Sequence, residues 1–353
     1  MASFAINGRF TVRKLTGQER FARELVAEID KICSKNEFIL VVPNYATDVP
    51  CYKNIDVVKY GNVKSHFWEQ IDFYRYAKIN GLLSVNLTTT CPFIDPGVVC
   101  IHDAAYFEIA DLLTRNLYGK LSTVWHRLLA KAVAKRAKRI LTVSNYSKDK
   151  LSEILHISKE RINVVYDAWQ HFNRLDMDDS IFDKLPSKIE RKKFFFALSS
   201  LSPQKNFIWI KEVAKRNPNQ QFVICGKTES ISGFDEKSLQ NGNIVFTGYI
   251  SDSQVKSLMN GCRAFIHPAI YEGFGIPPLE AMSCGAQVIA SNATCLPELY
   301  EDAVHYIDPY NYDVDLEALL QEPVAPAKKI LEKFSWEKEA SKLLGILRNI
   351  GST

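Results

Sequence analysis

The chain has 353 residues, of which 46% are hydrophobic and 24% are charged, and its formal net charge is +4 at pH 7. This composition is that of a soluble globular protein, and the length predicts two domains. No uninterrupted apolar run approaches the roughly 20 residues that span a bilayer, which excludes a membrane-spanning helix. The first ten residues also lack the pattern of a signal peptide, so a cytoplasmic protein is expected.

Apolar runs alternate with amphipathic stretches along the whole chain, which predicts α/β domains with parallel sheets and crossover helices. In the first half, strands are expected at residues 3–8, 37–44, 55–61, 82–87, 98–104, 139–145 and 161–168, and helices at 17–33, 68–79, 120–138 and 147–155. In the second half, strands are expected at residues 193–200, 221–227, 243–250, 262–268, 287–291 and 303–308, and helices at 207–216, 253–260, 278–284 and 337–349.

A charged segment, residues 171–192, shows no strong periodicity and contains Pro186, so it is interpreted as the link between two Rossmann-like domains. The predicted domains are residues 1–170 and 171–336, followed by a final helical segment at 337–353. In such domains ligands bind at the carboxyl ends of the strands, here expected at a shared cleft. Asp176 and Asp178 match a D-x-D metal motif, but a solvated acidic stretch is the better interpretation.

Two further patterns concern the charges and the cysteines. Residues 1–167 hold 24 Lys and Arg against 17 Asp and Glu, a net +7, while the rest of the chain carries −3. An anionic partner should therefore bind the first half. The eight cysteines contain no C-x-x-C pair. Buried free thiols in a reducing compartment are expected instead of disulfides or a zinc site, and neither a metal nor a separate cofactor is predicted.

The segment from Tyr271 to Glu280, with the sequence YEGFGIPPLE, joins a predicted strand to a predicted helix. Its glycines and prolines predict a tight turn that presents backbone N–H groups and the positive end of a helix dipole, which suits a phosphate. Glu272 precedes the turn, and Glu280 is expected in the first helical turn. A phosphate between two carboxylates that accept hydrogen bonds from hydroxyls indicates a sugar nucleotide. A plain βα turn is the alternative for a lone Glu-Gly pair.

This segment resembles the E-x7-E segment of the GT4 family of glycosyltransferases, and the similarity continues through Gly285, residues 288–291 and 296–298, and Asp308-Pro309. The resemblance implies the GT-B architecture, in which two Rossmann-like domains face a cleft and the last helix, 337–349, returns to the first domain. It implies that residues 1–170 bind the acceptor and that residues 171–336 bind the nucleotide sugar. It also implies that Glu272 contacts the donor sugar and that Glu280 binds the ribose. The turn residues Gly273, Phe274 and Gly275 would contact sugar or phosphate.

Lys205 is expected at the carboxyl end of a strand and beside a helix start, a position that suits a diphosphate, although a solvated loop lysine is the alternative. GT4 proteins carry a similar lysine that binds the donor diphosphate. The family usually adds an arginine where Ser200 or Gln204 stands here. Either another basic residue, such as Arg9 or Arg20 of the first domain, substitutes, or the enzyme is slow, or the protein is not an enzyme. Ser200 remains a donor-side candidate. The main chain of Tyr249-Ile250 would hold the nucleotide base.

In the first domain, Gly17 lies in a run that resembles the T-G-x-[QE]-R-[YF] pattern of GT4 proteins, whose glycine lies near the donor phosphates. Asn7-Gly8-Arg9-Phe10 looks like a subfamily that includes mannosyl- and rhamnosyltransferases of surface polysaccharides. His102 and Asp103 end a predicted strand, and the resemblance puts His102 near the donor sugar, although a structural histidine is the common alternative. Arg9, Arg20 and Asp103 are assigned to the acceptor side.

The resemblance implies a retaining, metal-independent transfer of a hexose from a nucleotide sugar to a saccharide that is carried on a lipid, with Lys205, Glu272 and His102 as the catalytic set. A catalytically silent scaffold and an enzyme acting on a protein or small molecule are the alternatives. No nucleic acid partner is predicted. Neither the nucleotide nor the sugar is specified by the sequence.

A helix is predicted over residues 120–138 with one apolar and one basic stripe. The apolar stripe contains Leu121, Val124, Trp125, Leu128 and Ala132. The basic stripe, Lys120, Arg127, Lys131, Lys135 and Lys138, lies about a quarter turn away. Cations that flank an apolar face are typical of a helix in a membrane interface. The sequence therefore allows peripheral binding to an anionic membrane, and the alternative is that the apolar stripe packs on the sheet.

Overall fold

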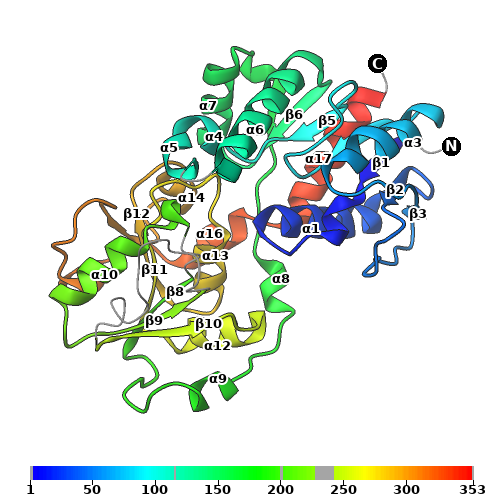
Figure 1. Ribbon diagram of the computed structural model, residues 1–353. Helices are drawn as coiled ribbons and strands as arrows, with labels where there is room; N and C mark the ends of the chain where they lie inside the picture. Colours follow the sequence, from blue (N-terminus) through cyan, green and yellow to red (C-terminus); the bar gives the residue numbers. More distant parts are fainter. Residues whose placement is uncertain (1–2, 115–116, 199–201, 227–241, 352–353) are drawn as a thin grey trace. The chain divides into compact units, whose positions relative to one another are not determined.

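The computed structural model describes residues 3–114, 117–198, 202–226 and 242–351. Contacts divide the chain into two compact units. The first unit contains residues 1–167 and 335–353, and the second contains residues 168–334 (Figure 1). Each unit is a parallel sheet with helices on its faces.

The sheet of the first unit has seven parallel strands in the order β3-β2-β1-β4-β5-β6-β7. The strands are β1 Phe4–Asn7, β2 Phe38–Val42, β3 Asp56–Lys59, β4 Leu83–Asn86, β5 Val98–Cys100, β6 Arg139–Thr142 and β7 Ile162–Val164. Most of these strands are buried apolar runs, as parallel strands covered on both faces should be. The strand order reverses between β1 and β4, and this switch point sets where a crevice opens at the carboxyl edge.

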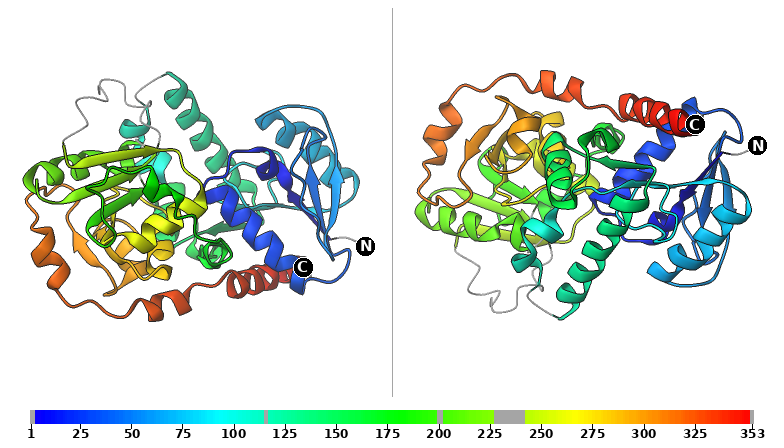
Figure 2. Two further views of the ribbon diagram at one scale, coloured as in Figure 1. Left: turned by 90° about the horizontal axis from the view of Figure 1, so that it is seen from below. Right: turned by 90° about the horizontal axis from the view of Figure 1, so that it is seen from above.

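The helices of the first unit include a long amphipathic pair, α1 Gly17–Ile32 and α17 Trp336–Gly351, which pack against each other (Figure 2). Arg348 forms two 2.8 Å contacts with Glu37, and the Glu339 carboxylate accepts a 2.9 Å hydrogen bond from the backbone of Tyr166. The last helix therefore belongs to the first unit. The other helical segments are η1 Gly8–Val12, α2 His66–Trp68, the π-helical η2 Glu69–Phe73, α3 Tyr74–Ile79, α4 Ala105–Glu108, α5 Ala110–Leu113, α6 Leu117–Arg136, α7 Asn145–Leu155 and η3 Lys159–Arg161.

The sheet of the second unit has six parallel strands in the order β10-β9-β8-β11-β12-β13, and its order reverses between β8 and β11. Phe195, Trp209 and Ile266 lie in its buried core. The strands are β8 Phe194–Leu198, β9 Gln221–Cys225, β10 Ile244–Gly248, β11 Ala264–His267, β12 Gln287–Ser291 and β13 His305–Ile307. The helical segments are α8 Gln170–Asn173, α9 Ser180–Asp183, η4 Pro203–Lys205, α10 Phe207–Arg216, α12 Asp252–Gly261, α13 Ile276–Ser283, α14 Leu296–Tyr300, α15 Leu316–Gln321 and α16 Ala327–Lys333.

The predicted fold class, two parallel-sheet Rossmann-like domains, is confirmed, and a strand lies at every expected place. Several details differ. The helix expected at residues 68–79 is interrupted by the π-helical η2, and α4, α5 and α14 to α16 were not predicted, because their short runs are too brief to show a period. The eight cysteines are free, as expected, although Cys51 is exposed.

In the part of the chain that the structure describes, no helix combines the length and the apolar character needed to cross a membrane.

Candidate functional site

The candidate donor site lies at the switch point of the second sheet, between β8 and β11. Lys205 ends η4, the short helical turn that follows β8, and Glu272 lies in the loop that follows β11. Helices leave an open sheet in opposite directions at a switch point, so side chains at the carboxyl ends of the two strands there can contact a ligand. Two residues expected to bind the donor, 67 positions apart in the sequence, are thereby brought into direct contact.

Lys205, Glu272 and His267 form one charged group. The Lys205 ammonium lies 2.5 Å from Oε1 of Glu272, and Nε2 of His267 lies 3.1 Å from the same oxygen without the alignment of a hydrogen bond. Burial would raise the pKa of Glu272, but the Lys205 charge and His267 more than offset this effect and lower the pKa to about 2. Glu272 is therefore an anion at any physiological pH, with a fixed position beside a cation.

The backbone of the turn after β11 is held by side chains from the loop between β12 and α14. The Thr294 hydroxyl accepts a 3.2 Å hydrogen bond from the Glu272 amide, and the Cys295 thiol donates to the Glu272 carbonyl at 3.2 Å. Gly275 has φ +87°, and an added Cβ would lie 3.1 Å from Leu296. Because a side chain is disfavoured at that φ, the glycine is needed for the chain to enter α13 here.

Glu280 does not lie in the first turn of α13, which corrects the expectation from the sequence. The helix begins at Ile276, two residues earlier than predicted, so that Glu280 is its fifth residue. Glu280 is 7% exposed, and its carboxylate lies 2.8 Å from Nε2 of the buried His171. A ligand hydroxyl that bonds to the Glu280 carboxylate would therefore meet a group that His171 already holds in place.

The remaining donor-side candidates lie at the ends of the neighbouring strands. Tyr249 and Ile250 directly follow β10, and the Tyr249 side chain is 73% exposed. Gly273 and Phe274 are buried in the turn, where Phe274 packs edge-on against Phe334. Ser200 lies outside the described residues. Gln204 is neutral, and its carbonyl accepts a hydrogen bond from Ile270, so no basic side chain stands at that family position.

The candidates from the first unit lie on several of its elements. His102 follows β5 and is buried against Phe21, and its Nε2 donates to the Leu87 carbonyl at 2.9 Å. Burial lowers the pKa of His102 to about 4, so the ring is neutral. Asp103 accepts a hydrogen bond from Ala105 at the start of α4. Two further candidates, Gly17 and Arg20, lie in the first turn of α1.

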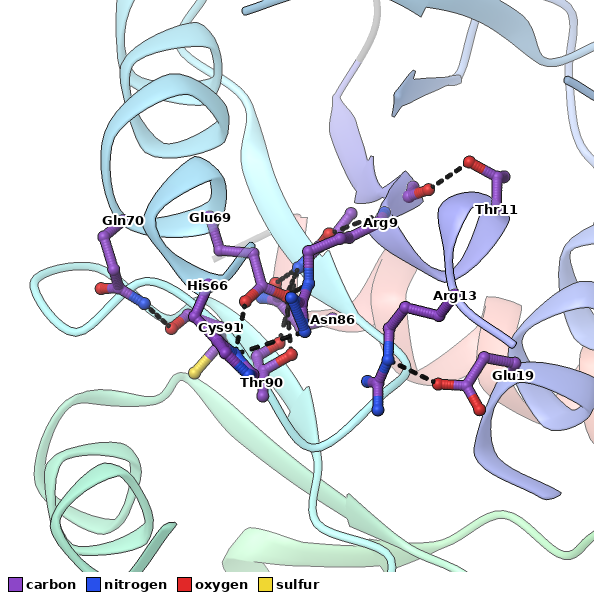
Figure 3. A network of polar contacts seen from close by, with 12 residues as sticks. Arg9, Thr11, Arg13, Glu19, His66, Glu69, Gln70, Asn86, Thr90 and Cys91 are labelled. Carbon is purple, nitrogen blue, oxygen red and sulfur yellow. Dashed lines mark hydrogen bonds and ion pairs between the residues drawn. The ribbon is translucent and has the colours of Figure 1, made fainter. Parts of the chain in front are cut away.

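Arg9 does not extend into solvent. It lies in η1 after β1, its side chain is 6% exposed, and its Nε lies 3.1 Å from the fully buried Glu69 (Figure 3). His66 meets the same guanidinium at 3.2 Å. Arg9 is therefore held inside the first unit by an ion pair and is unsuited to replace the missing donor-side arginine without breaking it.

Sequence reasoning missed three residues that contact the candidates: His267, His171 and Glu69. His267 ends the strand before the motif, and its place at the carboxyl end of β11 was a usable signal. His171 and Glu69 carry no local signal, because their partners Glu280 and Arg9 are 109 and 60 positions away in sequence. Among the described residues, no group of three His, Cys, Asp or Glu side chains is placed to hold a metal ion.

The sequence of the second unit is similar to that of a known protein family. Residues 179–322, which contain Lys205, Glu272 and Glu280, match the family model described as glycosyl transferases group 1. The chain contains a group 1 glycosyl transferase domain. The expected resemblance is thereby confirmed for the segment that carries the E-x7-E motif.

Part of the chain is similar to the O-antigen chain mannosyltransferase RfbU of Salmonella typhimurium, with 28% identity over 226 residues. The alignment covers 62% of this chain and 59% of that protein, so the chain spans about three fifths of the relative's length.

Solved structures share the fold of the full chain. Sucrose-phosphate synthase of Thermosynechococcus elongatus superposes with a TM-score of 0.72 at 13% identity, covering 100% of both chains. WaaG, a glycosyltransferase involved in lipopolysaccharide biosynthesis, superposes with a TM-score of 0.69 at 17% identity, covering 98% of this chain and 99% of that chain. The GT-B fold class expected from the sequence is confirmed, since both units of this chain are matched.

Proposed function

We propose that the protein is a retaining, metal-independent glycosyltransferase that moves a hexose from a nucleotide sugar to a saccharide acceptor of a surface polysaccharide. The observation that carries the proposal is the Lys205–Glu272 pair at the β8/β11 switch point within the group 1 domain. O-antigen mannosyltransferases among the relatives support a saccharide acceptor. A lipid carrier for that acceptor is part of the proposal.

The proposed chemistry assigns one task to each side chain. The bond between the anomeric carbon and the diphosphate oxygen breaks, and the acceptor oxygen bonds to the same face of that carbon. The acceptor proton passes to the leaving phosphate oxygen. Lys205 stabilises the charge that develops on the diphosphate, and the positive end of the α13 dipole adds to this stabilisation. Glu272 holds a sugar hydroxyl, and Glu280, positioned by His171, holds the ribose.

Transfer or hydrolysis should be measured with UDP-, GDP- and dTDP-sugars in the presence of EDTA, with the product anomer read by NMR. We expect turnover of one donor with retention, lost in Glu272→Gln and kept in Glu212→Gln. Glu212 is a matched control, because it forms a similar pair with Lys215 on α10 in the same unit. A strict metal requirement or an inverted product would contradict the mechanism. Tight nucleotide binding without transfer to any acceptor would favour the scaffold.

We also propose that α6 docks on an anionic membrane. The alternative, that its apolar stripe packs on the sheet, does not fit the exposures: Leu117 is 72% exposed, Leu121 63%, Val124 56% and Leu128 54%. The opposite face, with Leu129 and Val133 among others, supplies the contacts with the core. The apolar row is continuous in space because its members recur every three to four residues.

The charge beside this row suits lipid phosphates. Lys120, Lys131, Lys135 and Lys138 are exposed. The first three lie on α6 beside the apolar row, while Lys138 follows the end of the helix at Arg136. Arg127 is different from the expected set, because its Nε donates to the Tyr106 carbonyl at 2.8 Å within the unit. Four lysines near the surface would each contribute about 1 kcal/mol to binding an anionic leaflet. A lipid surface is therefore the occupant that fits both the apolar row and its charged flank.

Liposome sedimentation tests this docking. Binding should require anionic lipid, weaken with salt, and fall strongly in the double variant Lys131→Glu, Lys135→Glu. The double variant Lys31→Glu, Lys35→Glu changes the net charge of the same unit equally at another surface and should retain most binding. Equal binding to neutral and anionic vesicles, or equal loss in both double variants, would contradict docking through α6.

A further inference from the structure

The chain passes between its two units twice, once after residue 167 and once after residue 334. The first passage leads into residues 169–171 at the start of α8, and the second follows residues 331–334 at the end of α16. These two stretches, called the crossing segments below, both belong to the second unit. Any change that one unit transmits to the other along the chain has to pass them.

Two side-chain hydrogen bonds join the crossing segments to each other. The indole Nε1 of Trp169 donates to the Leu331 carbonyl at 2.9 Å, and the Gln170 amide donates to the Phe334 carbonyl at 2.8 Å. The carbonyls in the last turn of a helix have no partner within the helix, so the end of α16 offers acceptors at this place. The start of α8 and the end of α16 are thereby held as one piece.

This piece contacts the E-x7-E motif at two points. On α8, Nε2 of His171 lies 2.8 Å from Oε1 of Glu280. At the end of α16, Phe334 packs edge-on against Phe274, with 5.2 Å between the ring centroids. All four side chains are buried. Because a close-packed interior transmits a shift of one side chain to its neighbours, a displacement of the crossing segments acts on both parts of the motif.

Helix α8 is short enough for these contacts to decide its position. It has only four residues, Gln170–Asn173, and a helix of that length is not stable by itself. Lys256 of α12 holds the other end of α8 by donating to the carbonyls of Phe172 at 3.0 Å and Leu175 at 2.7 Å. The helix is therefore fixed between α12, the end of α16 and Glu280, and a change at any one of them acts on the other two.

We propose that Trp169, Gln170 and His171 are positioning residues that fix the Glu280 carboxylate for the ribose of the nucleotide, and that nucleotide binding acts in return on the crossing segments. The inference rests on the proposed function, in which Glu280 holds the ribose. His171 acts on Glu280 directly, and Trp169 and Gln170 act through His171 by holding α8 against the end of α16. A coupling of this kind is reciprocal, so each direction gives its own test.

Calorimetric titrations with UDP, GDP and dTDP, and with inorganic pyrophosphate, test the first direction. His171→Leu should weaken the nucleoside diphosphates by about tenfold and leave pyrophosphate unchanged, because pyrophosphate has no ribose for Glu280 to hold. His171→Gln should restore most of the affinity, since it places an amide nitrogen at the same ε position. Trp169→Phe should weaken the nucleoside diphosphates by about threefold.

Trp68→Phe is the matched control for Trp169→Phe. The indole of Trp68 donates to the Tyr60 carbonyl at 2.8 Å in the first unit, so the control removes the same kind of hydrogen bond at another place. It should change the affinity of neither ligand.

Fluorine NMR of protein that carries fluorinated tryptophan tests the return direction. The chain has five tryptophans, and the Trp169 signal is assigned by its absence in Trp169→Phe. Saturation with the nucleoside diphosphate that binds best should shift the Trp169 signal and leave that of Trp68 in place. In His171→Leu, saturated with the same ligand, the Trp169 shift should be lost.

Four results would overturn the proposal: nucleoside diphosphate affinity unchanged in His171→Leu, equal loss of pyrophosphate and nucleoside diphosphate affinity in that variant, a Trp169 signal that does not move, or binding of no nucleoside diphosphate. Donor turnover by the same samples separates the proposal from the proposed function. Turnover with an unchanged affinity in His171→Leu removes the positioning role and keeps the transferase. The expected shifts and affinities without transfer to any acceptor would refute the transferase and leave the positioning role standing.

Discussion

Substitutions at Lys205 and Glu272 are expected to change the binding of a nucleoside diphosphate in opposite directions. Lys205→Met removes the cation that meets the phosphates. A hydrogen bond to a charged group contributes about 1.5 to 3 kcal/mol, so affinity should fall by about tenfold to a hundredfold. Glu272→Gln removes an anion that both repels the diphosphate and holds the Lys205 ammonium at 2.5 Å. Affinity for a diphosphate without its sugar should therefore rise.

The size of that rise is bounded by the structure. The pKa of Glu272 is lowered from 4.5 to about 2, which corresponds to a net stabilisation of the carboxylate by about 3 kcal/mol. The charge of Lys205 is the largest cause that lowers the pKa of Glu272. Lys205 keeps part of its attraction to Glu272 when a diphosphate is bound, so only a part of the 3 kcal/mol is released by Glu272→Gln. A gain of about 1 kcal/mol, or about fivefold tighter binding, is expected.

Calorimetric titration of UDP, GDP and dTDP measures both effects on folded protein. The matched variants Lys215→Met and Glu212→Gln remove the members of an exposed pair on α10 and should leave affinity unchanged. If Lys205→Met and Glu272→Gln weaken diphosphate binding alike, then Glu272 either contacts the diphosphate itself or supports the shape of the site. The assignment of the diphosphate to Lys205 and of the sugar to Glu272 would then be wrong.

Three further outcomes follow from burial and backbone geometry. The folded pKa of Glu272 is depressed from 4.5 to about 2, so its contribution of about 3 kcal/mol to stability is present above pH 4.5 and is lost as pH falls towards 2. Urea unfolding should therefore show a smaller difference in the free energy of unfolding between pH 7 and pH 3 for Glu272→Gln than for the unsubstituted protein. Gly275→Ala should destabilise more than Gly285→Ala, by a difference of about 1 kcal/mol in chemical denaturation, because both have positive φ but only the Cβ at Gly275 meets a neighbour within 4 Å. Trp336→Ala, at a side chain 1% exposed beside Phe21, should destabilise the first unit by about 3 to 5 kcal/mol; scanning calorimetry should show that transition lowered and that of the second unit unmoved.

Local patterns in the sequence were enough to locate the strands and the motif turn. Buried parallel strands are continuous apolar runs, and the glycines and prolines before and at the start of α13 are residues typical of a tight turn. The predicted helix start at Pro278 is two residues later than the observed start at Ile276, because the pattern alone assigns Pro277 to the turn. Proline is favoured in the first turn of a helix, and α13 contains both in its first turn.

Contacts between distant polar residues could not be predicted in this way. Glu69 has the sequence context of an exposed helical residue, yet it is the centre of a buried network because η2 turns it towards Asn7 and Arg9. The periodicity of α6 predicted an apolar stripe, of which Leu121, Val124 and Leu128 are exposed, and a basic stripe, from which Arg127 departs because it bonds to the Tyr106 carbonyl. It could not tell which face of the helix packs on the sheet, because Leu129, Ala130 and Val133 form a second apolar face that is the one buried.

The two switch points lead to one last expectation, that the polar clusters of the two units can be changed independently. Lys205 and Glu272 contact each other in the second unit, and Glu69 contacts Arg9 and His66 in the first. Substitutions without shared partners are usually additive within about 0.5 kcal/mol. His66→Ala should therefore leave the nucleoside diphosphate affinity unchanged, and Lys205→Met should lower it equally with and without His66→Ala. Calorimetric titrations of both single variants and the double variant with UDP, GDP and dTDP measure this. A loss of diphosphate binding in His66→Ala would show that the first cluster takes part in the donor site, and the assignment of diphosphate binding to the second unit alone would fail.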